Sequence, residues 1–116
     1  MELIEKLKAL GVDTDEALGR FMGNAGLYVR MLGKFKKNAE ENASLEYFES
    51  GDYETAVAKT HTLKGVTGNL SLTPLYEACT EIVASLRAGE NDKAKALLID
   101  ILPLQEQIIA CIDGNS

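Results

Sequence analysis

Tryptophan is absent from this 116-residue sequence, and aromatic residues make up only 6% of it. A core must therefore be built mainly from Leu, Ile, Val, Ala and Met, and a hydrophobic content of 46% suits one compact domain over residues 1–116. Long apolar runs are also lacking, and the opening segment MELIEKLKAL carries charge in every turn. We therefore expect no signal peptide, no membrane span, and a cytoplasmic protein or the cytoplasmic part of one.

Motifs for nucleotides, metals and nucleic acids are missing as well. The ten glycines match neither G-x-x-x-x-G-K-[ST] nor G-x-G-x-x-G, so no nucleotide loop is expected. His61 is the only histidine, and Cys79 and Cys111 lie in apolar helical patterns, which favours small buried thiols over a disulfide or a zinc site. A redox or metal role for the two cysteines stays open as an alternative, to be decided by thiol accessibility. The net charge of -6 disfavours nucleic acid as a partner.

Apolar residues recur with a helical period along nearly the whole chain, and no convincing strand alternation is present. The pattern predicts an all-α protein, with a helical bundle as the default architecture. Asp52 is the expected N-cap of a central helix, Thr73 that of the next, and Pro103 is expected to kink the last. The other expected helices cover residues 2–10, 13–23, 25–40 and 91–112, with a short turn at ASLEYFES and a stop at Gly89.

The segment around His61 has an unusual pattern for a helix. At about 100° per residue, three residues project within about 60° of His61, namely Lys64, Gly65 and Gly68. Val57 and Leu72 fall on the same side if the helix continues that far. The opposite side carries an apolar stripe suited to a bundle core: Ala56, Leu63, Val66 and Leu70.

Glycine inside a helix costs about 1 kcal/mol relative to alanine, so Gly65 and Gly68 need an explanation. One explanation is that they lower the surface around His61 so that another macromolecule can approach it. The other is that Gly68 and Asn69 end the helix, that Gly65 accommodates packing, and that His61 is only a solvated residue. The spacing alone favours the second explanation, because single glycines are common in helices.

The segment HTLKGVTGNL, residues 61–70, resembles the signature of histidine-containing phosphotransfer (HPt) domains. In that signature the active histidine is followed by leucine, lysine and glycine, and then by a small residue, asparagine and leucine. The segments GVDTDEALGRFMGNAGLYVRMLGKF and FESGDYETAVAKTH are similar to the regions that precede the histidine in this family. The likeness covers about residues 11–90. Ser71 departs from it, because many members have glycine there.

The resemblance implies an antiparallel four-helix bundle with additional short N-terminal helices and an exposed phospho-acceptor, His61, on a central helix. It implies a monomeric phosphorelay carrier without an ATP-dependent kinase core, hence not an enzyme in its own right. The carrier exchanges a phosphoryl group with aspartates of response-regulator receiver domains, which hold the magnesium, and a hybrid sensor histidine kinase is a further candidate partner. Lys64 would stabilise charge on the phosphoryl oxygens. The expected docking residues are Gly65, Gly68, Val57 and Leu72.

Two further features of the sequence allow more than one interpretation. An HPt-like module that docks to regulators without carrying phosphate is the alternative function. Arg30, Lys34 and Lys37 lie on one side of the third expected helix, opposite its apolar stripe. Such a run is usually a solvated face, and its alternative role is to orient an acidic receiver surface.

Overall fold

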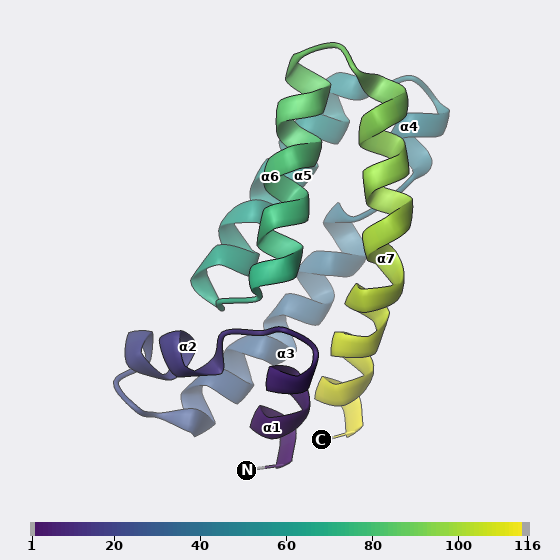
Figure 1. The fold of residues 1–116 in the computed structure, drawn as a ribbon. Coiled ribbons are helices and arrows are strands. Elements are labelled where there is room, and N and C mark those ends of the chain that lie inside the picture. The colour runs from purple at the N-terminus through teal and green to yellow at the C-terminus, as the bar shows by residue number, and fades with distance from the viewer. Residues whose placement is uncertain (1, 115–116) are drawn as a thin grey trace.

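The computed structural model describes residues 2–114, and all regular structure in that range is helical (Figure 1). The prediction of an all-α protein is therefore confirmed. Met1, Asn115 and Ser116, which belong to the predicted domain of residues 1–116, lie outside the described range. The helices are α1 (Glu2–Ala9), α2 (Thr14–Arg20), α3 (Ala25–Asn42), α4 (Glu46–Glu49), α5 (Tyr53–Asn69), α6 (Thr73–Arg87) and α7 (Asn91–Gly114).

Side-chain caps and glycines set most helix boundaries where the sequence predicts them. Asp13, Asn24 and Asp52 each accept a hydrogen bond from the backbone N–H three residues later, at 3.1, 3.0 and 3.2 Å. These bonds satisfy N–H groups that have no partner inside the helix. Gly89 ends α6 with a φ of +77°, a conformation that favours glycine.

The start of α6 differs from the prediction that Thr73 is its N-cap. Thr73 is the first residue of the helix, and Leu72 occupies the cap position without a side-chain cap hydrogen bond. The Thr73 hydroxyl donates to the Ser71 carbonyl at 3.3 Å instead of accepting from the helix. Leu72 is fully buried, so apolar packing rather than a polar cap holds this helix end.

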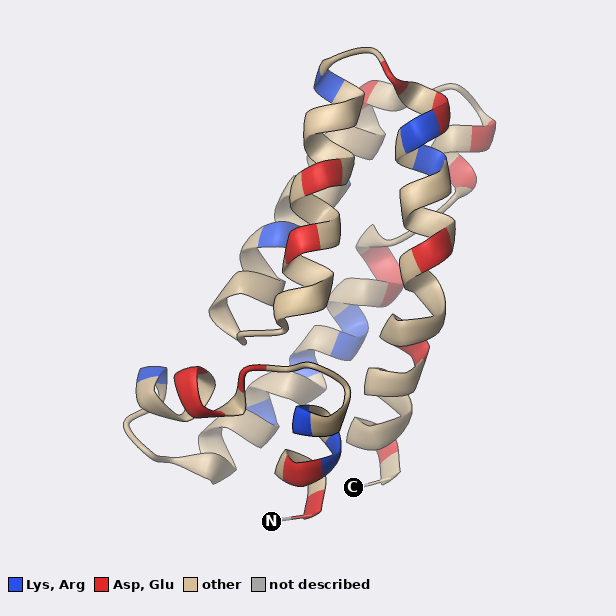
Figure 2. Cartoon of the chain, in the orientation of Figure 1, with Lys and Arg blue, Asp and Glu red and all other residues tan. Residues whose placement is uncertain are grey.

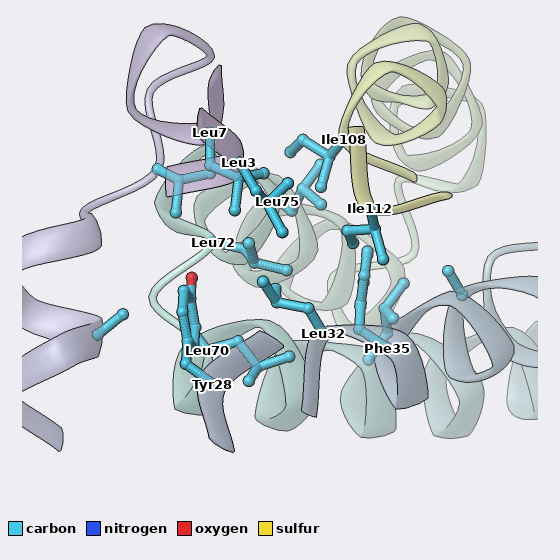
Figure 3. Close-up of a cluster of buried hydrophobic side chains, with 14 of the residues drawn as sticks. Leu3, Leu7, Tyr28, Leu32, Phe35, Leu70, Leu72, Leu75, Ile108 and Ile112 are labelled. Carbon is cyan, nitrogen blue, oxygen red and sulfur yellow. The ribbon is translucent and has the colours of Figure 1, made fainter. Parts of the chain in front are cut away.

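The helices pack around two buried apolar clusters. α5 packs against α6 and α3, and α6 also packs against α7 (Figure 1). The larger cluster joins α1, α3, α6, the α5–α6 turn and the C-terminal half of α7, and it includes Leu3, Leu32, Phe35, Leu72, Leu75 and Ile108 (Figure 3). The smaller cluster lies toward α4 and the α6–α7 turn and contains Phe48, Ala56, Ile82, Leu86, Ala94 and Leu98.

Tyr28 ties α3 to the end of α5. Its ring is fully buried, and its hydroxyl donates to the carbonyl of Leu70, the residue that follows α5, at 2.8 Å. Burial raises the pKa of Tyr28 because the interior disfavours the phenolate. The hydrogen bond fixes the α5–α6 turn, and with it the end of the helix that carries His61.

Replacing Tyr28 with Phe should therefore lower the free energy of unfolding by about 1–3 kcal/mol, the cost of leaving a buried carbonyl without a partner. Urea denaturation of both proteins at pH 7 measures this difference. Above pH 10 the two free energies of unfolding should become more similar. In the unfolded wild type Tyr28 ionises at the ordinary tyrosine pKa of 10.0, whereas in the folded protein it stays protonated, so high pH destabilises the wild type alone. A Tyr28→Phe protein as stable as wild type at pH 7 would show that this bond does not hold the turn.

Candidate functional site

The rotation of α5 decides which of its residues a partner can reach. Ala56, Leu63 and Leu70 are buried, and Val66 is half-buried against the larger cluster. His61 lies on the other side of the helix and is exposed. The apolar stripe expected from the sequence is thus the side that α5 packs against its neighbours.

Two threonines, Thr60 and Thr67, also lie on the buried side of α5, and the apolar pattern did not reveal them. Their hydroxyls donate to the carbonyls of Ala56 at 2.8 Å and Lys64 at 3.0 Å, within the same helix. Each hydroxyl is thereby satisfied without a partner from another helix. A pattern that counts only apolar residues cannot identify such positions.

His61 opens onto a cavity of about 610 Å³ between α2, α5 and α6. Its walls include Glu16 and Arg20 from α2, His61 and Lys64 from α5, and Tyr76 and Glu77 from α6. The volume is comparable with pockets that hold small molecules, which span about 300–1,000 Å³. The only histidine of the chain and a lysine one turn away therefore share one solvent-accessible space.

Lys64 is half-buried, and Tyr76 holds its side chain at the cavity. The Lys64 ammonium lies 6.0 Å from the centroid of the Tyr76 ring, at the distance of a cation–π contact. The positive charge of Lys64 also interacts electrostatically with Cys79, the buried thiol of α6. Burial raises the pKa of Cys79 to about 11, and the positive charge of Lys64 partly opposes that rise.

The two glycines beside His61 differ in their surroundings. A methyl group built on Gly65 would meet nothing within 4 Å, so the surface in front of it is open. The same group on Gly68 would lie 3.0 and 3.1 Å from two carbons of the Tyr76 ring. Gly68 thus accommodates a side chain of its own protein, and α5 ends one residue later, at Asn69.

Leu72 and Val57, the two apolar residues expected to dock a partner, do not line the cavity. Leu72 follows the end of α5 and is fully buried in the larger cluster, so the expectation that it docks a partner is wrong. The helical wheel failed there because the chain turns after Asn69. Val57 is half-buried and packs against the smaller cluster.

Ser71 connects the α5–α6 turn to α2, a link that the sequence did not indicate. It is buried and has a φ of +54°, a left-handed conformation unusual for serine and readily adopted by glycine. Its hydroxyl donates to Glu16 Oε1 at 2.8 Å, and its carbonyl accepts from the Asp13 N–H at 3.1 Å. Glu16 Oε1 also accepts from Arg20 Nη2 at 3.4 Å.

Arg30, Lys34 and Lys37 are exposed on α3, and none of them lines the cavity. Figure 2 shows basic positions recurring along α3. They lie opposite the buried side of that helix, as their spacing predicts. Their suggested role in orienting a partner stays a prediction.

Neither a metal site nor a membrane span is evident in the part of the chain that the structure describes. Within residues 2–114, no three His, Cys, Asp or Glu side chains are grouped so that they could hold a metal ion. No helix there is long and apolar enough to cross a bilayer.

Compared with protein-family models, with curated proteins and with solved structures, the chain matches none of them. Any functional conclusion therefore rests on the residues of the site and on the HPt-like motif.

Gly65→Ala and Gly68→Ala should affect stability differently. Gly65→Ala should hold or raise the free energy of unfolding, by up to about 1 kcal/mol, because alanine favours helix and meets no neighbour. Gly68→Ala should be less stable than Gly65→Ala by about 1 kcal/mol, because Tyr76 has to shift. Urea denaturation gives both values, and repeating the pair with Tyr76→Ala should remove the difference. Equal stabilities with Tyr76 present would contradict the packing role of Gly68.

The thiols should react in a fixed order. At pH 8 a maleimide should label the half-buried Cys111 before Cys79, which is buried and almost entirely protonated at that pH. Mass spectrometry of digested samples identifies the labelled residue, and urea should make both react. Rapid labelling of native Cys79 would instead favour the redox alternative.

Proposed function

We propose that this protein is an HPt-type phosphoryl carrier in which His61 is the acceptor. The observation that carries the proposal is the placement of His61, exposed on α5, in one cavity with Lys64. The likeness of HTLKGVTGNL to the HPt signature supports the same assignment. The partners are receiver domains that carry an aspartyl phosphate and hold the magnesium, with a hybrid sensor histidine kinase as a further candidate.

The transfer would proceed by nucleophilic attack of the imidazole on phosphorus. The ring nitrogen that bears no proton forms the N–P bond while the bond from phosphorus to the aspartate oxygen breaks. The carboxylate of the partner leaves with the electron pair, and the other ring nitrogen releases its proton to solvent. Delivery to the next receiver reverses these steps.

Lys64 and Gly65 have separate parts in this proposal. The Lys64 ammonium compensates the negative charge that collects on the phosphoryl oxygens during transfer. Gly65 leaves the surface beside His61 open, so that the rim of a receiver active site can approach the imidazole. Gly68 contributes indirectly, because it lets Tyr76 pack where it holds Lys64.

The architecture suits such a carrier. We interpret α3, α5, α6 and α7 as an antiparallel four-helix bundle, with α1 and α2 as additional short helices. The packing of α5 on α3 and α6, and of α6 on α7, supports this interpretation. A monomer in the cytoplasm is the expected form of the carrier.

A binding-only module is the competing proposal, and phosphorylation distinguishes the two. His61→Gln should keep the fold, because the side chain is exposed, and should abolish labelling by a phosphorylated receiver domain. The label on the wild type should be labile in acid and stable in base, as expected for a phosphoramidate. Base-labile, acid-stable phosphate, or undiminished labelling of His61→Gln, would refute His61 as the acceptor. A folded wild type that binds receivers but takes no label would support the binding-only module.

Lys64→Gln should still accept phosphate but more slowly, and Lys59→Gln provides a matched control. Lys59 is also on α5, and its ammonium lies 5.9 Å from the centroid of the Tyr47 ring, but it is not part of the cavity. The Lys64 effect should shrink at 1 M salt, where the screening length is about 3 Å. Initial labelling rates of the wild type and both variants at low salt and at 1 M salt measure this effect. Equal rates for Lys64→Gln and Lys59→Gln would remove Lys64 from the mechanism.

A further inference from the structure

We infer that Arg20 provides a second cation for the phosphoryl group on His61, and that Glu16 and Ser71 position it. The inference rests on the proposed function and adds to it a residue from a helix outside the HPt-like motif. Arg20 lies at the end of α2 and lines the same cavity as His61 and Lys64. Two cations would thus face the phosphoryl group, one from α5 and one from α2.

The Arg20 side chain contacts Glu16 and still has donors for another group. Its Nη2 donates to Glu16 Oε1 at 3.4 Å, and its side chain is 51% exposed. That distance is long for a charge-assisted hydrogen bond, which is typically about 2.7–2.9 Å. A guanidinium has five N–H donors in a planar fork that matches phosphate oxygens. Arg20 therefore has donors left for a phosphoryl group.

Glu16 is fixed by the turn that follows the histidine helix. The Ser71 hydroxyl donates to Glu16 Oε1 at 2.8 Å, and the Ser71 carbonyl accepts from the Asp13 N–H at 3.1 Å. These two bonds attach α2 to the α5–α6 turn. Serine adopts the left-handed conformation here although glycine would do so more easily, and only serine supplies the hydroxyl. Ser71 and Glu16 thus hold α2, and with it Arg20, at the cavity.

The charges of the cavity show why a second cation matters. Its carboxylates are Asp13 at the N-cap of α2, Glu16 of α2 and Glu77 of α6, and its cations are Arg20 and Lys64. A phosphoryl group adds about 1.5 to 2 negative charges near pH 7. With Lys64 alone, the phosphoryl group would face three carboxylates and one cation. Arg20 offsets Glu16 and offers donors to the phosphoryl oxygens.

The test is the titration of the phosphohistidine, followed by ³¹P NMR. The phosphorylated ring keeps one nitrogen that takes up a proton near neutral pH. The 116-residue chain is therefore labelled with a phosphorylated receiver domain, purified, and titrated between pH 6 and 9. A cation in contact with the phosphoryl oxygens disfavours that proton and lowers the pKa of the phosphohistidine. Arg20→Gln should therefore raise it by about half a pH unit, the size expected for a partly exposed charge pair, and slow labelling about three- to tenfold. Arg20→Lys should restore part of the shift, and the exposed Arg87 of α6, changed to Gln, should have no effect.

A Glu16→Gln protein separates direct contact with Arg20 from the effect of an unpaired Glu16 carboxylate. Arg20→Gln also leaves the Glu16 charge unpaired, so the same change is made in a Glu16→Gln protein. Contact with Arg20 predicts that the pKa of the phosphohistidine still rises there. Ser71→Ala should give a smaller shift in the same direction, with helical content preserved by circular dichroism.

The outcomes distinguish this inference from the proposed function. If the wild type takes no label, the proposed function fails, and the inference fails with it. If labelled Arg20→Gln has the wild-type phosphohistidine pKa and labelling rate, the inference is wrong while His61 stands as the acceptor. A shift that vanishes in the Glu16→Gln background would overturn contact between Arg20 and the phosphoryl group. Wild-type behaviour of Ser71→Ala would overturn the positioning role of Ser71.

Discussion

The fold and the site both depend on the short turn between α5 and α6. Tyr28 of α3 donates to the carbonyl of Leu70, while Ser71 bonds the backbone of Asp13 and the side chain of Glu16. Leu72 then inserts into the larger apolar cluster. Polar groups that a tight turn would leave buried without partners are thus paired with α2 and α3. Residues 70–72 thus connect α2 and α3, which are distant in sequence, to the end of α5.

Local signals predicted most of the fold. The cap Asp52 and the stop at Gly89 act within one helical turn, so their chemistry can be read from neighbouring residues. The rotation of α5 followed from the spacing of its apolar residues. Thr73 was the exception, because burial of the adjacent Leu72 outweighed the usual preference for a polar cap.

The candidate site was predictable only where it is contiguous in sequence. His61, Lys64 and Gly65 lie within about one turn of a helix, and helical spacing alone places them on one side of it. Arg20, Glu16 and Tyr76 reach the same cavity from other helices, and no local pattern relates them to His61. Gly68 was identified as unusual, but its neighbour, the Tyr76 ring, becomes evident only when α6 folds back on α5.

Two walls of the cavity come from distant parts of the chain. One is the run from His61 to Gly68, where helical spacing fixes the proposed acceptor relative to its lysine. Another is α2, which contacts the rest of the protein through Ser71 and through packing beside α1 and α3. Changes on α2 leave the spacing of His61 and Lys64 intact. In a lineage of such proteins, positions of α2 other than Glu16 and Arg20 are therefore free to vary while the proposed acceptor and its lysine keep their arrangement.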